Sequence, residues 1–224
     1  MQGIIPVLKP KGPTSHDIVA AVRRMVGARR VGHAGTLDPL ASGVLVIGIG
    51  SATKQLHNEM LKEKEYEAEI TLGATTTTDD AEGERTDHDV PTPPTRTDIE
   101  AILPEYIGNI QQLPPAFSAV KVGGIPAYAH ARKGRVVTLG ARSVEIMSIE
   151  IFSYAWPKLS LRVVTGPGVY IRSLARDIGE RLGCGGYISE LVRTRVGEFY
   201  IADAVPVEGV PEYLLEQEQG HPSS

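Results

Sequence analysis

A short segment, residues 32–43 with the sequence GHAGTLDPLASG, holds the residues best suited to chemistry. Its first and fourth residues are glycines, which allow a backbone to approach a ligand closely. Pro39 restricts Asp38 to an extended backbone, and the apolar run 43–50 is typical of a buried strand. A carboxylate held on such a support could act as a nucleophile. The same Asp-Pro step also occurs in plain turns, and the residues alone leave both interpretations open.

Motifs for nucleotides and metals are incomplete or absent in this sequence. Residues 48–54, GIGSATK, suggest a phosphate-binding loop, but Thr53 stands where a glycine must precede the lysine. A dinucleotide fingerprint fails at the same residue. The chain has one cysteine, Cys184, and six histidines, which argues against a structural zinc site. We therefore expect chemistry without a cofactor or a metal ion, and a buried Cys184.

Charge is unevenly distributed along the 224 residues, whose net charge is −4. Residues 1–62 carry eight Lys and Arg against three Asp and Glu, whereas residues 79–105 carry nine acids. The last 20 residues contain four Glu and no Lys or Arg. A cationic first third favours binding of a polyanion such as a nucleic acid. The alternative, that these charges only decorate solvated surfaces, stays open.

Hydrophobic patterns predict an α+β fold around a largely antiparallel sheet, because strands and helices do not alternate regularly. Residues 62–72 alternate between apolar and polar, which predicts a strand with Tyr66 on its core-facing side. Residues 74–97 read as a long loop, and the composition after Asp203 is coil-like. No segment reads as a signal peptide or a membrane span, which favours a cytoplasmic protein. Further strands are predicted at 3–8, 43–50, 144–152 and 159–165, and helices after Thr14 or Ser15, at 99–107, at 128–132 and at 171–182.

Several motifs, in order, resemble the bacterial tRNA pseudouridine-55 synthases, the TruB family. The stretch GHAGTLDPLASGVL is similar to the family signature. The resemblance covers roughly residues 4–204 and departs from the common pattern at Leu8 and Thr77, where many members carry Asp. Other matching stretches are KPKGPTS at 9–15, KEY at 64–66, DAEG at 80–83, PAFSAVK at 115–121, ARKG at 131–134, GVYIRSL at 168–174 and LGCG at 182–185.

The resemblance implies a pseudouridine synthase fold, with a mixed, mainly antiparallel central sheet flanked by helices and loops. It implies a catalytic domain at residues 1–203 that carries an RNA-binding insertion at about 111–141. Residues 204–224 are then expected to be a short acidic tail in place of a full PUA domain.

The resemblance also implies three catalytic residues. Asp38 is the catalytic carboxylate, and Tyr66 stacks on a uridine flipped out of the RNA. Arg172, at the start of a helix, pairs with Asp38 or with a phosphate. Without the resemblance, Tyr66 reads as a core aromatic residue and Arg172 as a solvated side chain on a polar helix face.

Five further residues are implied in substrate binding. His33 helps to hold the flipped RNA loop, and Tyr170 and Leu191 line the uracil pocket. Lys9 and Lys121 lie in motifs that bind the substrate.

The activity implied is isomerisation of uridine 55 in the tRNA T-loop, without cofactor or metal. The partner is the T-arm stem-loop of tRNA, with no membrane and no obligate protein partner, and we expect a monomer. One alternative is a non-catalytic RNA-binding module or tRNA chaperone. Another is a carboxylate-pair hydrolase, for which no acid partner of Asp38 is evident.

Overall fold

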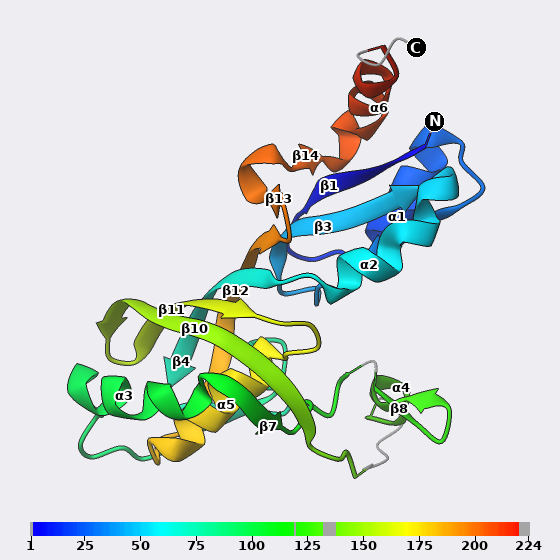
Figure 1. Ribbon diagram of the computed structural model, residues 1–224. Coiled ribbons are helices and arrows are strands. Elements are labelled where there is room, and N and C mark those ends of the chain that lie inside the picture. Colours follow the sequence, from blue (N-terminus) through cyan, green and yellow to red (C-terminus); the bar gives the residue numbers. More distant parts are fainter. Residues whose placement is uncertain (1, 119, 132–137, 220–224) are drawn as a thin grey trace. The chain divides into compact units, whose positions relative to one another are not determined.

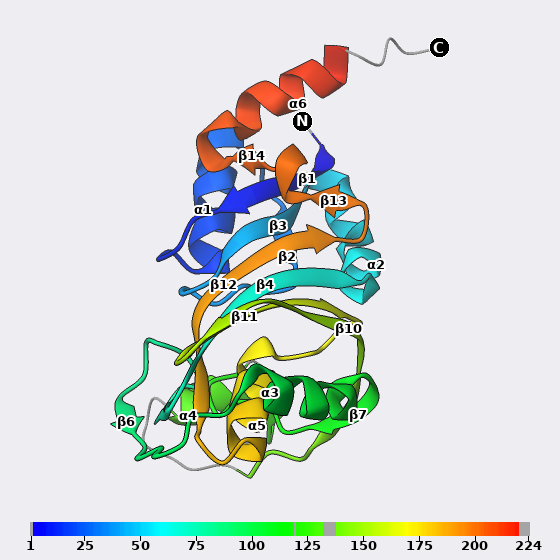
Figure 2. The ribbon, with the colours of Figure 1, turned by 90° about the vertical axis from the view of Figure 1, so that its left-hand side faces the viewer.

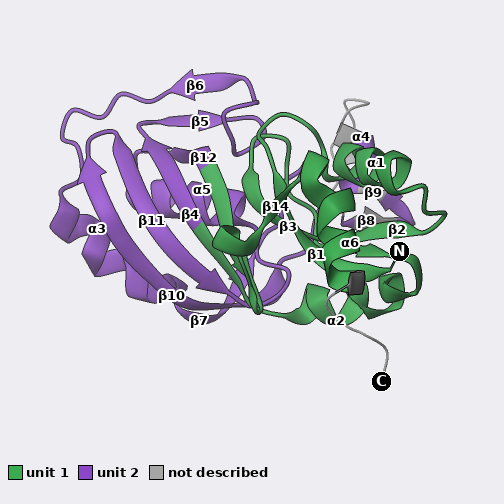
Figure 3. Cartoon of the chain, turned by 90° about the horizontal axis from the view of Figure 1, so that it is seen from above, with its two compact units in different colours: residues 1–66, 191–224 green, residues 67–190 purple. Residues whose placement is uncertain are grey.

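The computed structural model describes residues 2–118, 120–131 and 138–219, which form two compact units (Figure 3). Unit 1 comprises residues 1–66 and 191–224, and unit 2 comprises residues 67–190. The chain enters unit 2 within strand β4 (Lys64–Leu72) and leaves it within strand β12 (Gly186–Val196). The predicted strand at residues 62–72 is thus confirmed.

Unit 1 is built on strands in the order β14-β1-β3-β12 (Figure 1), and β2 is also paired to β3. Strand β3 is antiparallel to β1 and parallel to β12, where Arg193 pairs with Gly43. Its residues 43–49 are buried, as their continuous apolar run predicts. The bounds are β1 Gly3–Lys9, β2 Val31–Ala34, β3 Ser42–Ile49, β13 Phe199–Tyr200 and β14 Val205–Pro206.

Helix α1 (Ser15–Val26) covers this sheet and begins at a capping box. The Thr14 hydroxyl accepts from the backbone N–H of Asp17, whose carboxylate accepts from the N–H of Thr14. The helix ends at Gly27 in the left-handed conformation, with φ 63°. Its apolar stripe packs on the sheet beside Leu45 and Ile47. A 3-10 turn (Gly50–Gln55) and helix α2 (Leu56–Leu61) follow β3.

Residues 204–219 are folded, so the expectation of a coil-like tail is wrong for them. A 3-10 turn (Val207–Gly209) leads into helix α6 (Val210–Gln219). Val210 and Leu214 are buried in the same core as α1 and β1. A few apolar residues suffice here because they join an existing core instead of building a separate one.

Unit 2 contains strands in the order β4-β11-β10-β7, and β10 is antiparallel to both of its neighbours. Helices α3 and α5 lie on one side of β10 and β11 (Figure 2). Helix α5 shows the predicted 3.6-residue spacing, with Leu174, Ala175 and Ile178 buried. The bounds are α3 Arg96–Ile102, a 3-10 turn Leu103–Tyr106, β7 Gly108–Gln112, β10 Arg142–Ala155, β11 Lys158–Thr165 and α5 Ile171–Arg181.

The long loop expected at residues 74–97 contains a small hairpin of β5 (Ala74–Thr76) and β6 (Arg85–Asp87). Within the predicted insertion at 111–141, residues 111–112 belong to β7 of the main sheet. The insertion also contains β8 (Lys121–Val122), β9 (Ile125–Pro126) and α4 (Ala127–Ala131), while residues 132–137 lie outside the described part.

The predicted class, α+β with a mainly antiparallel sheet, is confirmed. Across the described residues, no helix is both long enough and apolar enough to cross a membrane.

Candidate active site

Asp38 lies in the connection between β2 and β3 of unit 1 and is half-buried. The N–H of Ala41 donates to the carbonyl of Asp38 at 3.1 Å, so the Asp-Pro step does form a turn. The turn and the functional interpretation are compatible, because a turn presents the carboxylate from the end of a buried strand.

The backbone on each side of Asp38 is fixed by groups distant in sequence. The buried hydroxyl of Ser15 accepts from the N–H of Leu37 at 2.8 Å and donates to its carbonyl at 2.9 Å. On the other side, the N–H of Gly12 donates to the carbonyl of Pro39 at 2.8 Å. The first turn of α1 and the turn before it therefore hold both neighbours of Asp38.

Lys9 is fully buried at the end of β1, and its ammonium contacts backbone carbonyls. Nζ donates to Ala41 at 2.7 Å, to Pro10 at 3.0 Å and to Pro39 at 3.5 Å. These bonds join the end of β1 to the Asp38 loop. They give Lys9 a structural task, and its predicted contact with substrate stays a prediction.

His33, near the end of β2, packs edge-on against the exposed His16 of α1, with ring centroids 5.5 Å apart. Burial lowers the pKa of His33, and the neighbouring His16 and Arg193 lower it further. The ring is therefore neutral near pH 7, and its surface is available for stacking without a charge.

Tyr66 and Leu191 lie on β4 and β12, which are neighbours in the strand order. Both side chains are buried, with 8% and 7% exposed. A hydrogen bond of 2.9 Å from the Thr194 hydroxyl to the Glu65 carboxylate joins these two strands. Burial of Tyr66 fits both a core role and a role in a pocket for a base.

Lys64, two residues before Tyr66, is buried with 6% exposed. Its Nζ donates to the carbonyls of Met60 and Lys62, each at 2.5 Å. Burial lowers the pKa of Lys64 to about 8, with a further contribution from Arg193. Unit 1 thus keeps Lys9, Lys64 and Arg193 in its interior.

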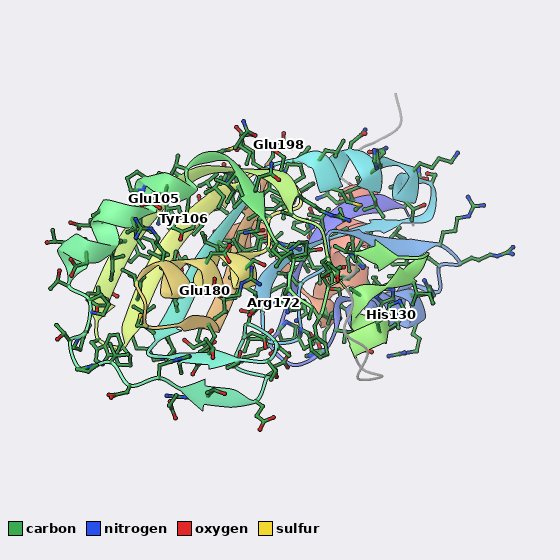
Figure 4. The ribbon with its side chains drawn as sticks, turned by 90° about the horizontal axis from the view of Figure 1, so that it is seen from below. Glu105, Tyr106, His130, Arg172, Glu180 and Glu198 are labelled. Carbon is green, nitrogen blue, oxygen red and sulfur yellow. The ribbon has the colours of Figure 1, made fainter. Side chains whose placement is uncertain are left out.

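Arg172 is the second residue of α5 in unit 2 (Figure 4). Only 5% of it is exposed, so the alternative of a solvated arginine is wrong. Its guanidinium donates to the carbonyls of Thr78 at 2.9 Å and Phe117 at 3.0 Å. Nε lies 3.5 Å from the carboxylate of the buried Asp80. Arg172 is therefore oriented by two loops of unit 2.

Tyr170 precedes α5 and is half-buried. Its backbone N–H donates to Oε1 of Gln112 at 2.8 Å, and its carbonyl accepts from Nε2 of Gln112 at 3.1 Å. Gln112 is 1% exposed, so this pair fixes the start of α5 against β7. Lys121 belongs to β8, and its side chain lies outside the described part.

Three residues that orient the candidate site are not among the functional residues predicted from the sequence. Ser15 was expected only as a possible helix cap, yet Thr14 is the cap and Ser15 holds Leu37. Asp80 lies within the matching DAEG motif, which marks its position but not its ion pair with Arg172. Gln112 has no sequence signal, because a single amide in a strand reads as a surface residue.

The described residues include His, Cys, Asp and Glu side chains, which are common metal ligands. Within that part of the chain, no group of three or more His, Cys, Asp or Glu is arranged to hold a metal ion. Cys184 is buried with 1% exposed, as expected for a small apolar side chain.

Family models match most of the sequence. Residues 23–171 match the N-terminal domain of the TruB family of pseudouridylate synthases. The chain belongs to the TruB family. Residues 172–223 match the C-terminal domain model of tRNA pseudouridylate synthase B, a match that includes helix α6. The family resemblance carried by the GHAGTLDPLASGVL stretch is confirmed.

Relatives in the TruB family are similar over most of their length. A tRNA pseudouridine synthase B of Xanthomonas oryzae pv. oryzae is 44% identical over 96% of this chain and 70% of its own. The enzyme of the same name from Thermobifida fusca is 47% identical over 92% of this chain and 73% of its own. The expectation of a pseudouridine synthase that acts on tRNA is therefore confirmed.

Solved structures support the TruB fold. A chain of the archaeal box H/ACA sRNP Nop10–Cbf5 complex superposes with a TM-score of 0.70 and 29% identity, covering 98% of this chain. This chain spans 56% of that one. A chain of an H/ACA RNP bound to a substrate RNA gives a TM-score of 0.70 at 28% identity. The predicted pseudouridine synthase fold is confirmed.

Proposed function

We propose that the protein converts uridine 55 in the T-loop of tRNA to pseudouridine, with Asp38 as the catalytic carboxylate. The TruB family supports the reaction, and the names of the relatives support tRNA as the substrate. The position of the uridine and the roles of single residues are the proposed part.

The chemistry exchanges one bond of the ribose for another. The bond from C1′ to N1 of uracil breaks, the base turns, and a bond from C1′ to C5 forms. C5 then loses its proton and N1 gains one, so the reaction needs no oxidant or reductant. We assign the stabilisation of the detached sugar or base to Asp38. Its carboxylate would act either by forming a covalent bond or through its negative charge.

Base handling is assigned to the side chains that the family motifs single out. Tyr66 stacks on the flipped uracil, and Leu191 and Tyr170 line its pocket. His33 is assigned to the flipped RNA loop, which its neutral ring suits. Arg172 is assigned to a phosphate near the reacting nucleotide, and Lys121 contacts the RNA backbone.

The observation that carries this proposal is the fixed backbone around Asp38. Ser15 binds Leu37, while Gly12 and Lys9 bind Pro39, so the loop is held on both sides of the carboxylate. Rigid support of this kind is what a covalent or electrostatic catalyst requires, because the reacting atoms must stay within a fraction of an ångström of their positions.

The site in the RNA can be tested with one unmodified tRNA and its U55C variant. After incubation with the protein, pseudouridine is mapped by carbodiimide labelling and primer extension. We expect one new stop, one nucleotide 3′ of position 55, and none in the variant. Modification at another position, or none in either RNA, would contradict the proposal. The second result would support the non-catalytic RNA-binding alternative.

We further propose that the protein works as a monomer on free tRNA in the cytoplasm, without an obligate protein partner. Light scattering after size-exclusion chromatography, with and without tRNA, tests the oligomeric state. A 1:1 complex is expected, and a stable dimer would contradict this part.

A further inference from the structure

Arg193 of β12 is an arginine enclosed in the core of unit 1, with only 1% of it exposed. Burying a guanidinium is costly unless its donors are used. Nε donates to the carbonyl of Val44 at 2.8 Å, and Nη2 donates to the carbonyl of Gly35 at 3.1 Å. These two partners of the cation are backbone carbonyls at either end of the loop that carries Asp38.

These two carbonyls lie on opposite sides of Asp38. Gly35 is the first residue after β2, and Val44 is the third residue of β3. A guanidinium is planar, with its donors at fixed angles. One rigid group therefore sets the distance between the two ends of the loop that carries Asp38.

The backbone at this point is packed as closely as glycine allows. Gly43 has φ 106° and pairs with Arg193 in the parallel register of β3 and β12. A Cβ on Gly43 would lie 2.2 Å from the carbonyl oxygen of Arg193. Only glycine fits this approach, and it brings the end of the loop within reach of the arginine.

We propose that Arg193 is a positioning residue for Asp38: by joining the carbonyls of Gly35 and Val44, it holds the loop in the geometry that the reaction needs. This inference rests on the proposed catalytic role of Asp38. Arg193 acts through the loop and touches neither RNA nor base. Its loss displaces the carboxylate, and a displacement of about 1 Å costs on the order of 100-fold in rate.

The test compares Arg193→Lys and Arg193→Met with a matched control, Arg195→Met. Arg195 lies on the same strand but donates to the carbonyl of Gly197 and pairs with Glu63. For each variant we measure the single-turnover rate on tRNA, the Kd for tRNA and the thermal unfolding curve.

We expect Arg193→Met to lose about 100-fold in rate, with Kd within about threefold of wild type, while Arg195→Met keeps the wild-type rate. Lysine keeps the charge but has no planar pair of donors, so Arg193→Lys should recover only part of the loss. In an Arg193→Ala variant, added methylguanidinium should restore part of the rate without changing Kd.

Several outcomes would overturn the inference. A folded Arg193→Met or Arg193→Lys variant with the wild-type rate would show that the loop does not need the guanidinium. Equal losses in rate and affinity, or unfolding of both variants, would make Arg193 a residue of general stability. An inactive wild-type protein, or an active Asp38→Asn variant, would instead overturn the proposed function.

Discussion

At the scale of single residues, the burial of Tyr66 leaves a core role and a stacking role to be separated by experiment. Tyr66→Phe keeps the ring, whose stacking on a base is worth about 1–3 kcal/mol, and Tyr66→Ala removes it. We expect the Ala variant to lose most single-turnover activity while the Phe variant keeps its affinity for tRNA. Circular dichroism controls for folding. If folded Phe and Ala variants both react like wild type, Tyr66 is only a core residue.

Lys64 gives a pH-dependent stability, because burial lowers its pKa from 10.5 to about 8. Between these values the unfolded chain binds more protons than the folded one, so this group makes stability rise with pH from about 8 to about 10.5. Below pH 8, Lys64 is charged in both states, and burial of this charge destabilises the folded state by on the order of 3 kcal/mol.

The variant Lys64→Met should lack this rise. Urea unfolding at pH 7.5, 8.5 and 9.5 measures it as the difference between wild type and variant, in which the other groups cancel. We expect the free energy of unfolding of wild type to increase relative to that of Lys64→Met as the pH rises. Parallel stability curves would show that Lys64 keeps an ordinary pKa in the folded protein.

At the scale of elements, local patterns predicted those parts whose signal lies within the element itself. The alternation around Tyr66 predicted β4, and the stripe through Ile171, Leu174 and Ile178 predicted α5. The Asp38 loop was recognisable from its glycines and from its resemblance to a family motif. The residues that hold this loop were not recognisable, because Ser15 lies 22 residues from Leu37 and Arg193 lies 149 residues from Val44. Contacts at such separations leave no periodic pattern.

Helix α6 is an element that the sequence pattern did not predict. A short, acidic segment is typical of coil, and its helix is stabilised by a core that the segment itself does not reveal. Leu214 is 2% exposed and packs in the unit 1 core, whereas Leu215 beside it is 46% exposed. We expect Leu214→Ala to lower the free energy of unfolding by about 2–5 kcal/mol, and Leu215→Ala to change it little. Urea denaturation measures both. Equal effects would mean that α6 is not docked as described.

At the scale of the whole molecule, the net charge of −4 hides a cationic region in unit 1. Arg23 and Arg24 lie in the last turn of α1, Arg29 and Arg30 follow it, and all four are exposed. The Asp38 loop contacts Ser15 at the other end of this helix, about 12–14 Å along its axis from Arg23 and Arg24. These arginines are therefore remote from the loop and suited to an RNA backbone outside the reacting nucleotide.

Changing these four arginines to Gln should weaken tRNA binding and reduce its salt dependence. The slope of the logarithm of the binding constant against the logarithm of the salt concentration should become shallower by up to about 3. The single-turnover rate at saturating RNA should not change. A control variant removes four exposed arginines of unit 2, and with them the same total charge: Arg85, Arg96, Arg142 and Arg181. If both variants alter the slope equally, only the total charge matters. If neither does, the RNA lies elsewhere.

The central claim, that Asp38 carries out the isomerisation, is tested most directly by tritium release from tRNA labelled at C5 of its uridines. Asp38→Asn keeps the size of the side chain and removes its charge and nucleophilicity. The wild-type protein should release one equivalent of tritium per tRNA. The variant should react at least about 10⁴-fold more slowly, with its affinity for tRNA largely kept. Release by folded Asp38→Asn at a rate near that of wild type would contradict the assignment of Asp38 and the mechanism built on it.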